Sequence, residues 1–211
     1  MPFSTYMQWA LHDPQHGAYG SGRLRVGPRG DFATSPSLGP DFAALLAPQL
    51  VQWLEAQPPD APLALVETGP GEGQLALQLA EALRAHWPAL AARTELVLVE
   101  PNAGMADRQR RALEACPLPC RWTSLERLAA SPLRGVMLAH EVLDALAVER
   151  IVWDGRQWRR QGVALKEALE TADPAPPQLQ LADGPPLPEE LVAQLAPLGL
   201  EPPGPQRPAG W

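Results

Sequence analysis

Four short apolar runs alternate with amphipathic segments over residues 61–147, and this pattern predicts the fold. The runs at 62–68, 94–102, 120–122 and 135–141 are interpreted as strands, and most of them are nearly continuous in apolar residues. Continuous apolar character is typical of strands buried on both faces of a parallel sheet. The intervening segments at 73–87, 103–116 and 124–130 are interpreted as helices. The sequence therefore predicts an α/β fold with a doubly wound, mostly parallel sheet.

The flanking segments have different patterns. Residues 3–11 predict a short helix, and residues 12–40 are dense in Gly, Pro and Ser, which is typical of a binding loop or lid. Apolar positions recur at helical spacing over 41–57. The Asp154-Gly155 pair between two β-compatible runs predicts a β-hairpin. After residue 170 the chain is rich in proline, so we expect an irregular tail with at most one helical patch, at 188–196.

Composition and charge exclude several classes of partner. The 211 residues are 45% hydrophobic and 19% charged, with a formal net charge of −7. An acidic chain is not suited to nucleic acid or an anionic membrane, and no apolar run reaches the roughly 20 residues of a membrane span. The start shows no secretory signal, so we expect a cytoplasmic location. No metal is expected, because Cys116 and Cys120 lack a second Cys or His pair.

The turn after the first predicted strand, Glu67 to Gly73, carries glycines at 69, 71 and 73. Ligands of doubly wound sheets bind beyond the carboxyl ends of the strands, and glycine lets a ligand come close to the backbone. No lysine follows, as a P-loop requires, and the glycine spacing differs from that of a dinucleotide fingerprint. Glu100 closes the second strand, where an acid can accept hydrogen bonds from ribose hydroxyls. The alternative is that these are ordinary turn and strand-end residues.

The pattern E-x-G-x-G-x-G resembles the S-adenosyl-L-methionine loop of class I methyltransferases. Three blocks in order, GDFATSPSLGP, LVETGPGEGQLA and AHEVLDALAVERIVW, resemble the MidA-like family, which includes the mitochondrial arginine methyltransferase that assists respiratory complex I assembly. The resemblance implies a protein substrate and S-adenosyl-L-methionine as the cofactor. It implies roles in three places: a cofactor site of Glu67, Gly69, Gly71, Gly73, Glu100 and His140, a lid of Asp31, Thr34 and Ser35, and catalytic carboxylates at Glu141 and Asp144.

Glu141 and Asp144 follow the fourth predicted strand, next to the expected position of the transferred methyl group. Two carboxylates there can clamp a guanidinium and orient it for attack on the methyl carbon. The alternative is that Glu141 caps the next helix and Asp144 pairs with Arg150. Three positions depart from the family pattern: His140 replaces Asn, Ser37 replaces Glu and Ala147 replaces Pro. If the charge lost at Ser37 helps to bind a basic substrate, the affinity should fall.

The resemblance covers residues 3–160, and the family's later G-G-x-x-L-x-I-D-Y-G strand does not occur here. We therefore expect an incomplete, C-terminally truncated fold with an exposed sheet edge. Its expected segments are an N-terminal lid and helix (1–60), a cofactor-binding core (61–147), an added β-hairpin (148–170) and a Pro-rich tail (171–211). The expected function is protein arginine methylation linked to respiratory complex assembly. The alternatives are a catalytically impaired cofactor-binding assembly factor and a fragment that binds no ligand.

Overall fold

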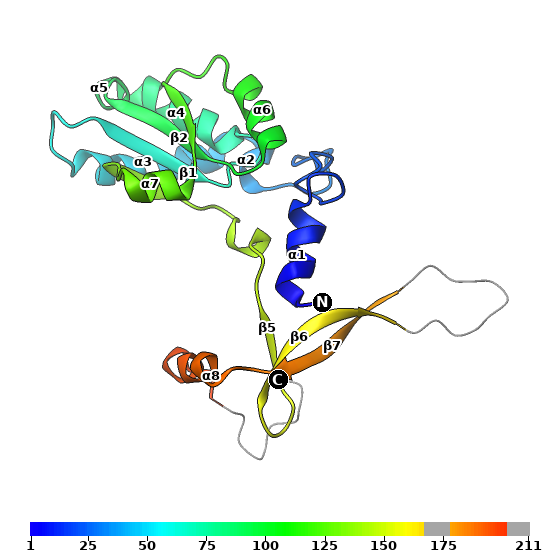
Figure 1. The fold of residues 1–211 in the computed structure, drawn as a ribbon. Coiled ribbons are helices and arrows are strands. Elements are labelled where there is room, and N and C mark those ends of the chain that lie inside the picture. The colour runs from blue at the N-terminus through cyan, green and yellow to red at the C-terminus, as the bar shows by residue number, and fades with distance from the viewer. Residues whose placement is uncertain (167–177, 202–211) are drawn as a thin grey trace. The chain divides into compact units, whose positions relative to one another are not determined.

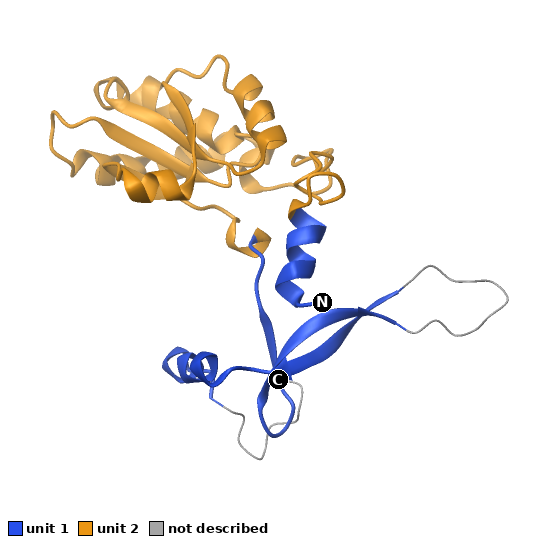
Figure 2. Ribbon diagram, viewed as in Figure 1, with its two compact units in different colours: residues 1–11, 146–211 blue, residues 12–145 orange. Residues whose placement is uncertain are grey.

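The computed structural model describes residues 1–166 and 178–201, and the chain divides into two compact units (Figure 2). One unit comprises residues 12–145. The other comprises residues 1–11 together with the chain from 146 onward. Within the described ranges, no helix combines the length and the apolar character needed to cross a membrane.

The larger unit is built on a four-stranded parallel sheet (Figure 1). Its strands are β1 (Leu63–Thr68), β2 (Thr94–Val99), β3 (Cys120–Thr123) and β4 (Gly135–Leu138), in the spatial order β3-β2-β1-β4. Every neighbouring pair is parallel, and Val66 of β1 lies between Val97 of β2 and Met137 of β4. The sheet confirms the predicted doubly wound α/β fold, since each predicted strand is present and helices cover both faces.

Helices precede and connect these strands, and three helical elements of the larger unit were not predicted. The expected helices appear as α1 (Phe3–His12), α3 (Asp41–Glu55), α4 (Gln74–His86), α6 (Ala103–Ala112) and α7 (Leu125–Ala130). The additional ones are α2 (Ser35–Leu38), α5 (Pro88–Ala91) and the 3₁₀ turn η1 (Leu143–Ala145). Each is only one turn long, too short for a helical repeat to show in the sequence.

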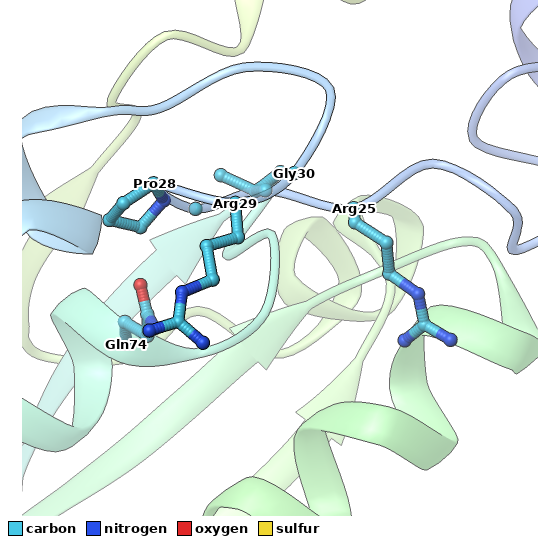
Figure 3. A pocket seen from close by; sticks show the side chains of 7 residues that line it. Arg25, Pro28, Arg29, Gly30 and Gln74 are labelled. Atoms are coloured by element: carbon cyan, nitrogen blue, oxygen red, sulfur yellow. The ribbon is translucent and has the colours of Figure 1, made fainter.

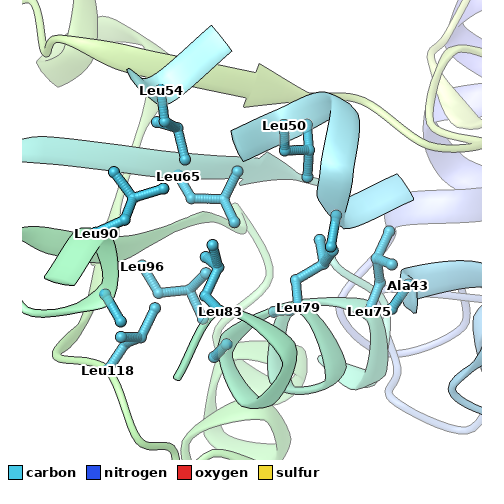
Figure 4. Close-up of a cluster of buried hydrophobic side chains, with 14 of the residues drawn as sticks. Ala43, Leu50, Leu54, Leu65, Leu75, Leu79, Leu83, Leu90, Leu96 and Leu118 are labelled. Carbon is cyan, nitrogen blue, oxygen red and sulfur yellow. The ribbon is translucent and has the colours of Figure 1, made fainter. Parts of the chain in front are cut away.

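Side chains alternate between the two faces of the sheet, and the two faces bury different residues. Leu65 and Leu96 point to the face covered by α3 and α4, where they meet Leu50, Leu79 and other buried side chains (Figure 4). On the opposite face, a smaller cluster packs against Leu128 of α7; it consists of Ala64, Val66, Val97 and Val99. Burying a leucine contributes roughly 1.5–3 kcal/mol, so the larger cluster dominates the stability of this unit.

Strand β4 lies at one edge of the sheet. Among the described residues it pairs with β1 on one side and with no strand on the other. Met137 of β4 is 53% exposed, unlike the residues of the two central strands, which are almost entirely buried. Among the described residues, β4 and β3 are thus the two edge strands of this sheet.

The second unit contains an antiparallel sheet of three strands in the order β5-β6-β7. The predicted hairpin is present as β5 (Arg150–Trp153) and β6 (Trp158–Leu165), and Asp154 closes its turn by accepting backbone hydrogen bonds from Arg156 and Gln157. The chain's N-terminal ammonium donates to the carbonyl oxygen of Val163 at 2.8 Å.

The prediction of an irregular tail is wrong for residues 179–186. They form β7 (Leu179–Pro186), which pairs with β6. The strand depends on a distant partner and not on local composition, and its prolines are tolerated because β7 is an edge strand. The predicted helical patch is present as α8 (Glu189–Leu195), followed by the 3₁₀ turn η2 (Ala196–Leu198). Residues 171–177 and 202–211 of the expected tail lie outside the described residues.

Candidate functional site

The turn between β1 and α4 is built from left-handed glycines. Gly69, Gly71 and Gly73 have φ values of 63°, 55° and 83°, a region in which residues with a Cβ are strained. The Gly69 N–H donates to the carbonyl oxygen of Val99 at 3.0 Å, which joins the turn to the end of β2. A Cβ added at Gly71 would meet nothing within 4 Å. The space above Gly71 is therefore open to a ligand.

Glu67 lies at the carboxyl end of β1, directly before this turn, and is only 4% exposed. Burial raises the pKa of its carboxyl group from 4.5 to about 7, and a hydrogen bond from the Ala76 backbone offsets only part of this effect. Its Oε2 atom has no hydrogen-bond partner among residues 1–166 and 178–201. A buried acceptor without a donor is costly, so this atom marks a place where a ligand donor would stabilise the site.

Glu100 follows β2 and is half-buried, with its carboxylate fixed from two sides. Oε1 accepts a hydrogen bond from the backbone N–H of Asn102 at 2.9 Å, and Oε2 accepts one from Nε2 of Gln109 at 3.0 Å. Burial raises the pKa of this carboxyl group, while the two hydrogen bonds lower it. Each oxygen keeps a further lone pair. The carboxylate is thus oriented and able to accept more hydrogen bonds.

Gln109 of α6 is a site residue that the sequence reading missed. Its side chain is completely buried and donates to the carbonyl oxygen of Gly71 at 2.8 Å as well as to Glu100. The sequence predicts a helix over 103–116, in which Gln109 stands among arginines and is not distinguished from them. One signal was available: Met105, Gln109 and Leu113 are spaced by four, so Gln109 continues the apolar stripe of this helix.

The glycine-rich loop after α1 is attached to the same region. The side-chain amide of Asn102 donates to the carbonyl oxygen of Gly20 at 3.0 Å. The Arg108 guanidinium donates to the carbonyl oxygens of Gly22 and Leu24 and lies 3.2 Å from a carboxylate oxygen of Glu72, in the glycine turn. The loop that the sequence predicts as a lid is therefore bonded to α6, and α6 is bonded to the turn.

The predicted lid residues are placed in the next part of this loop, where they build its local structure. Asp31 is exposed, and its Oδ2 accepts from the backbone N–H of Arg25 at 2.8 Å, which closes a turn. Thr34 precedes α2, and its backbone N–H donates to Oγ of Ser37 at 2.9 Å. Ser35 is the exposed first residue of α2. Ser37 therefore takes the side-chain position that Glu occupies in a capping box, a structural role that needs no charge.

An open hollow of about 370 Å³ lies between this loop and the start of α4. Residues 25–30 form one side, and Gln74, the first residue of α4, forms the other. The side chain of Arg29 extends alongside Gln74, while Arg25 points away from it (Figure 3). Gln78, one turn further along α4, donates to the carbonyl oxygen of Pro36 at 3.0 Å. The lid segment thus lies over the helix that begins at the glycine turn.

The predicted catalytic carboxylates lie after β4. Glu141 is exposed and has a φ of 50°, the one positive value for a non-glycine residue in the part of the chain described. Strain of this kind is often found at functional sites. Asp144 is exposed within η1. In the second unit, Arg150 donates to Oε1 of Gln161, and its guanidinium lies over the ring of Phe3.

Two ring side chains, His12 at the end of α1 and Tyr19 in the loop after it, lie near the η1 turn. His12 Nε2 lies 2.8 Å from the carbonyl oxygen of Ala145, and its ring stacks on Tyr19 with centroids 6.1 Å apart. Burial, and then the charge of Asp144, raise the pKa of the Tyr19 phenol. The ring of His140, predicted to contact the cofactor, lies against Phe42 of α3, with centroids 5.0 Å apart.

Known proteins are similar to most of this chain in sequence. A family described as "Putative S-adenosyl-L-methionine-dependent methyltransferase" matches residues 45–207. The chain belongs to this family. The expected relationship to MidA-like methyltransferases is therefore confirmed, and S-adenosyl-L-methionine is the cofactor that defines the family.

Individual known proteins with methyltransferase names are also similar to this chain. The chain is 30% identical to a mitochondrial protein arginine methyltransferase NDUFAF7 homolog of Drosophila melanogaster, covering 75% of this chain and 40% of that protein. It is 29% identical to mitochondrial NDUFAF7 of Danio rerio, covering 82% and 44%. A COG1565 superfamily member from Burkholderia thailandensis, solved bound to S-adenosyl-homocysteine, is 32% identical with a TM-score of 0.72 over 93% of this chain and 48% of that one. The chain thus spans less than half the length of these relatives.

Proposed function

We propose that this chain binds S-adenosyl-L-methionine above the glycine turn and takes part in methyl transfer to an arginine of a partner protein. The observation that carries the proposal is the fixed carboxylate of Glu100, which keeps free acceptor positions and is joined through Gln109 to the peptide of Gly71, where the space is open. Family membership supports the cofactor, and the names of the arginine methyltransferase relatives support the substrate.

The residues present fit the cofactor. Glu100 offers acceptors for the two hydroxyls of a ribose. Gly71 leaves room that any other residue would fill. Glu67 holds a buried oxygen that needs a donor, which the ammonium group of the methionine portion would supply. These three residues stand at the carboxyl ends of β1 and β2, where ligands of doubly wound sheets bind.

Bound S-adenosyl-L-methionine would supply an electrophilic sulfonium methyl group, which can pass to nitrogen while sulfur keeps the bonding electrons. Glu141 and Asp144 would hold the planar guanidinium through charge-assisted hydrogen bonds, so that one nitrogen faces the methyl carbon. Glu141 would then accept the proton that the methylated nitrogen releases. The strained backbone at Glu141 supports this role, because strain of this kind persists at positions where the orientation of the side chain is needed for function.

The proposed acceptor is an arginine in a subunit of a respiratory complex, which the resemblance to MidA-like methyltransferases implies. The relatives named above are described as mitochondrial, whereas the sequence predicts a cytoplasmic location, and that location stays a prediction.

The lid loop, with Arg25 and Arg29 at its surface, adds positive charge beside the proposed cofactor site.

Two measurements test the proposal. Calorimetry with S-adenosyl-homocysteine should show saturable binding, and Glu100→Ala should weaken it. Methyl groups labelled on S-adenosyl-L-methionine should then appear on arginine in a respiratory-complex fraction, and Glu141→Gln should abolish the transfer. No measurable binding would refute the cofactor site, whereas binding with no transfer would refute the activity alone.

A second candidate function is a cofactor-binding assembly factor without catalysis. The position of His140 favours it, because the ring packs on Phe42 where the family has an asparagine. Under this alternative, the chain binds S-adenosyl-homocysteine with Glu100 intact and transfers no label to any protein, and His140→Asn restores transfer if the lost amide is the cause.

A further inference from the structure

Gln109 forms three hydrogen bonds while being completely buried in the larger unit. Its Nε2 donates to the carbonyl oxygen of Gly71 at 2.8 Å and to Oε2 of Glu100 at 3.0 Å. Its Oε1 accepts from the indole N–H of Trp122, on β3, at 3.0 Å. One side chain on α6 therefore connects the loops that follow β1 and β2 with the neighbouring strand β3.

The indole of Trp122 fixes which way the amide points. An indole nitrogen only donates, so it must face the oxygen of the Gln109 amide. The NH₂ group then faces the opposite direction, where both of its hydrogens meet acceptors, namely the Gly71 carbonyl and the Glu100 carboxylate. A flipped amide would place its oxygen against two other oxygens and its NH₂ against the indole N–H. The network thus has one satisfied arrangement.

The hydrogen bond to Glu100 also has a geometric consequence. With Oε1 held by the Asn102 backbone and Oε2 held by Gln109, the carboxylate plane is fixed at two points. Without Gln109, the carboxylate would be held at one point and could rotate about its terminal bond. The peptide of Gly71 would lose its side-chain partner in the same step.

We propose that Gln109 is a positioning residue of the cofactor site, which holds the Glu100 carboxylate and the Gly71 peptide in a fixed mutual geometry for the ribose and for the part of the cofactor above the turn. The inference rests on the role of Glu100 proposed above. Gln109 touches neither the ribose nor the methyl group in this scheme; it acts through Glu100 and Gly71.

The test is a double-mutant cycle on binding of S-adenosyl-homocysteine, measured by calorimetry with the full chain. Gln109→Met keeps the length of the side chain and removes its donors and acceptor. We expect the dissociation constant to rise about tenfold, as for loss of a hydrogen bond to a charged group. In a Glu100→Ala background, Gln109→Met should raise the dissociation constant by less than half of that factor, because the carboxylate that Gln109 holds is absent.

A matched control separates positioning from general destabilisation. Thr94 is also buried, and its Oγ1 donates to the carbonyl oxygen of Leu90 at 2.8 Å, but it stands at the opposite end of β2 from Glu100. Thr94→Val removes a buried hydrogen bond of the same unit and should leave the dissociation constant within twofold. A rise for Thr94→Val equal to that for Gln109→Met would overturn the proposal.

The remaining outcomes are also decisive. A rise of less than threefold for Gln109→Met, or an equal rise with and without Glu100, overturns the positioning role. If Glu100→Ala itself leaves binding unchanged, the proposed ribose role of Glu100 fails instead. Should Gln109→Met not fold, Gln109→Asn is measured against the same thresholds, since it keeps the amide but is one methylene too short to reach all three partners.

Discussion

Val142, in the loop after β4, packs directly against Gly69, in the turn after β1. A Cβ added at Gly69 would lie 2.5 Å from Cγ2 of Val142, closer than real Cβ atoms approach a neighbour. Val142 directly follows Glu141 in the chain. The loop that carries the proposed acceptor carboxylates is therefore in contact with the turn that carries the proposed cofactor site, and glycine at 69 is what permits the contact.

The glycines of this turn should differ in what their replacement costs. Gly69→Ala combines a left-handed φ with the Val142 clash, so we expect about 3 kcal/mol of destabilisation in urea unfolding. Gly71→Ala meets no protein atom and should cost only about 1 kcal/mol. Its new methyl group occupies the space proposed for the cofactor, so S-adenosyl-homocysteine affinity should fall at least tenfold.

Gly155 provides the control for backbone strain, because it has a φ of 98° and open space in the hairpin of the other unit. Gly155→Ala should reduce stability by a similar amount to Gly71→Ala and leave the affinity unchanged. Equal affinities for the Gly71→Ala and natural chains would show that no ligand lies over this turn.

Glu100→Ala should weaken binding of S-adenosyl-homocysteine at least tenfold, because it removes the carboxylate proposed to accept hydrogen bonds from the two ribose hydroxyls. Titration calorimetry measures the effect. Glu95→Ala is the comparison, because Glu95 stands on β2, the strand that Glu100 follows, and forms a partly exposed ion pair with Arg121 at 2.8 Å. Such a pair contributes little, and its loss should not change the affinity. The ribose role is excluded if the two variants bind equally well.

Glu67 should make stability depend on pH. Burial raises its pKa to about 7 in the folded chain from an ordinary 4.5, so between these values the unfolded chain ionises while the folded chain stays protonated. Rising pH therefore favours unfolding across this window and has no further effect from this group above it. The free energy of unfolding that is lost across this window is about 3 kcal/mol.

Glu67→Gln mimics the protonated side chain and removes this dependence. Urea unfolding of both chains at about pH 5 and pH 8, without ligand, should show the variant gaining stability over the natural chain as pH rises. A constant difference between the two chains at both pH values would mean that the Glu67 carboxyl group titrates normally.

Replacing Glu141 should separate function from stability. Asparagine accepts a left-handed backbone more readily than glutamate, so Glu141→Asn should leave stability unchanged or slightly raised. Methyl transfer should nevertheless fall at least a hundredfold with the proton acceptor removed. Glu126→Gln, at an exposed position in α7, should change neither quantity. A Glu141→Asn chain with full transfer activity would place the proton acceptor elsewhere.

Several features of the site could be predicted from the sequence because each depends on local pattern. The apolar runs predicted the strands, and the glycines predicted the turn after β1. Glu100 was predicted to lie at the end of β2 because it directly follows that apolar run. Other features depend on distant partners. The pairing of residues 179–186 with β6 could not be read from a proline-rich composition, and the use of Ser37 at the start of α2 became clear only from its bond to Thr34.

The sequence by itself determined the order of strands and helices, the glycine turn and the acids beside it, since periodicity and backbone freedom are properties of neighbouring residues. The tertiary structure alone decided which side chains complete the site. Gln109 looks like a polar residue in a basic helix until β3, the glycine turn and Glu100 surround it. Only then does the cost of burying an amide require that each of its polar atoms find a partner, and this requirement fixes the geometry of the carboxylate.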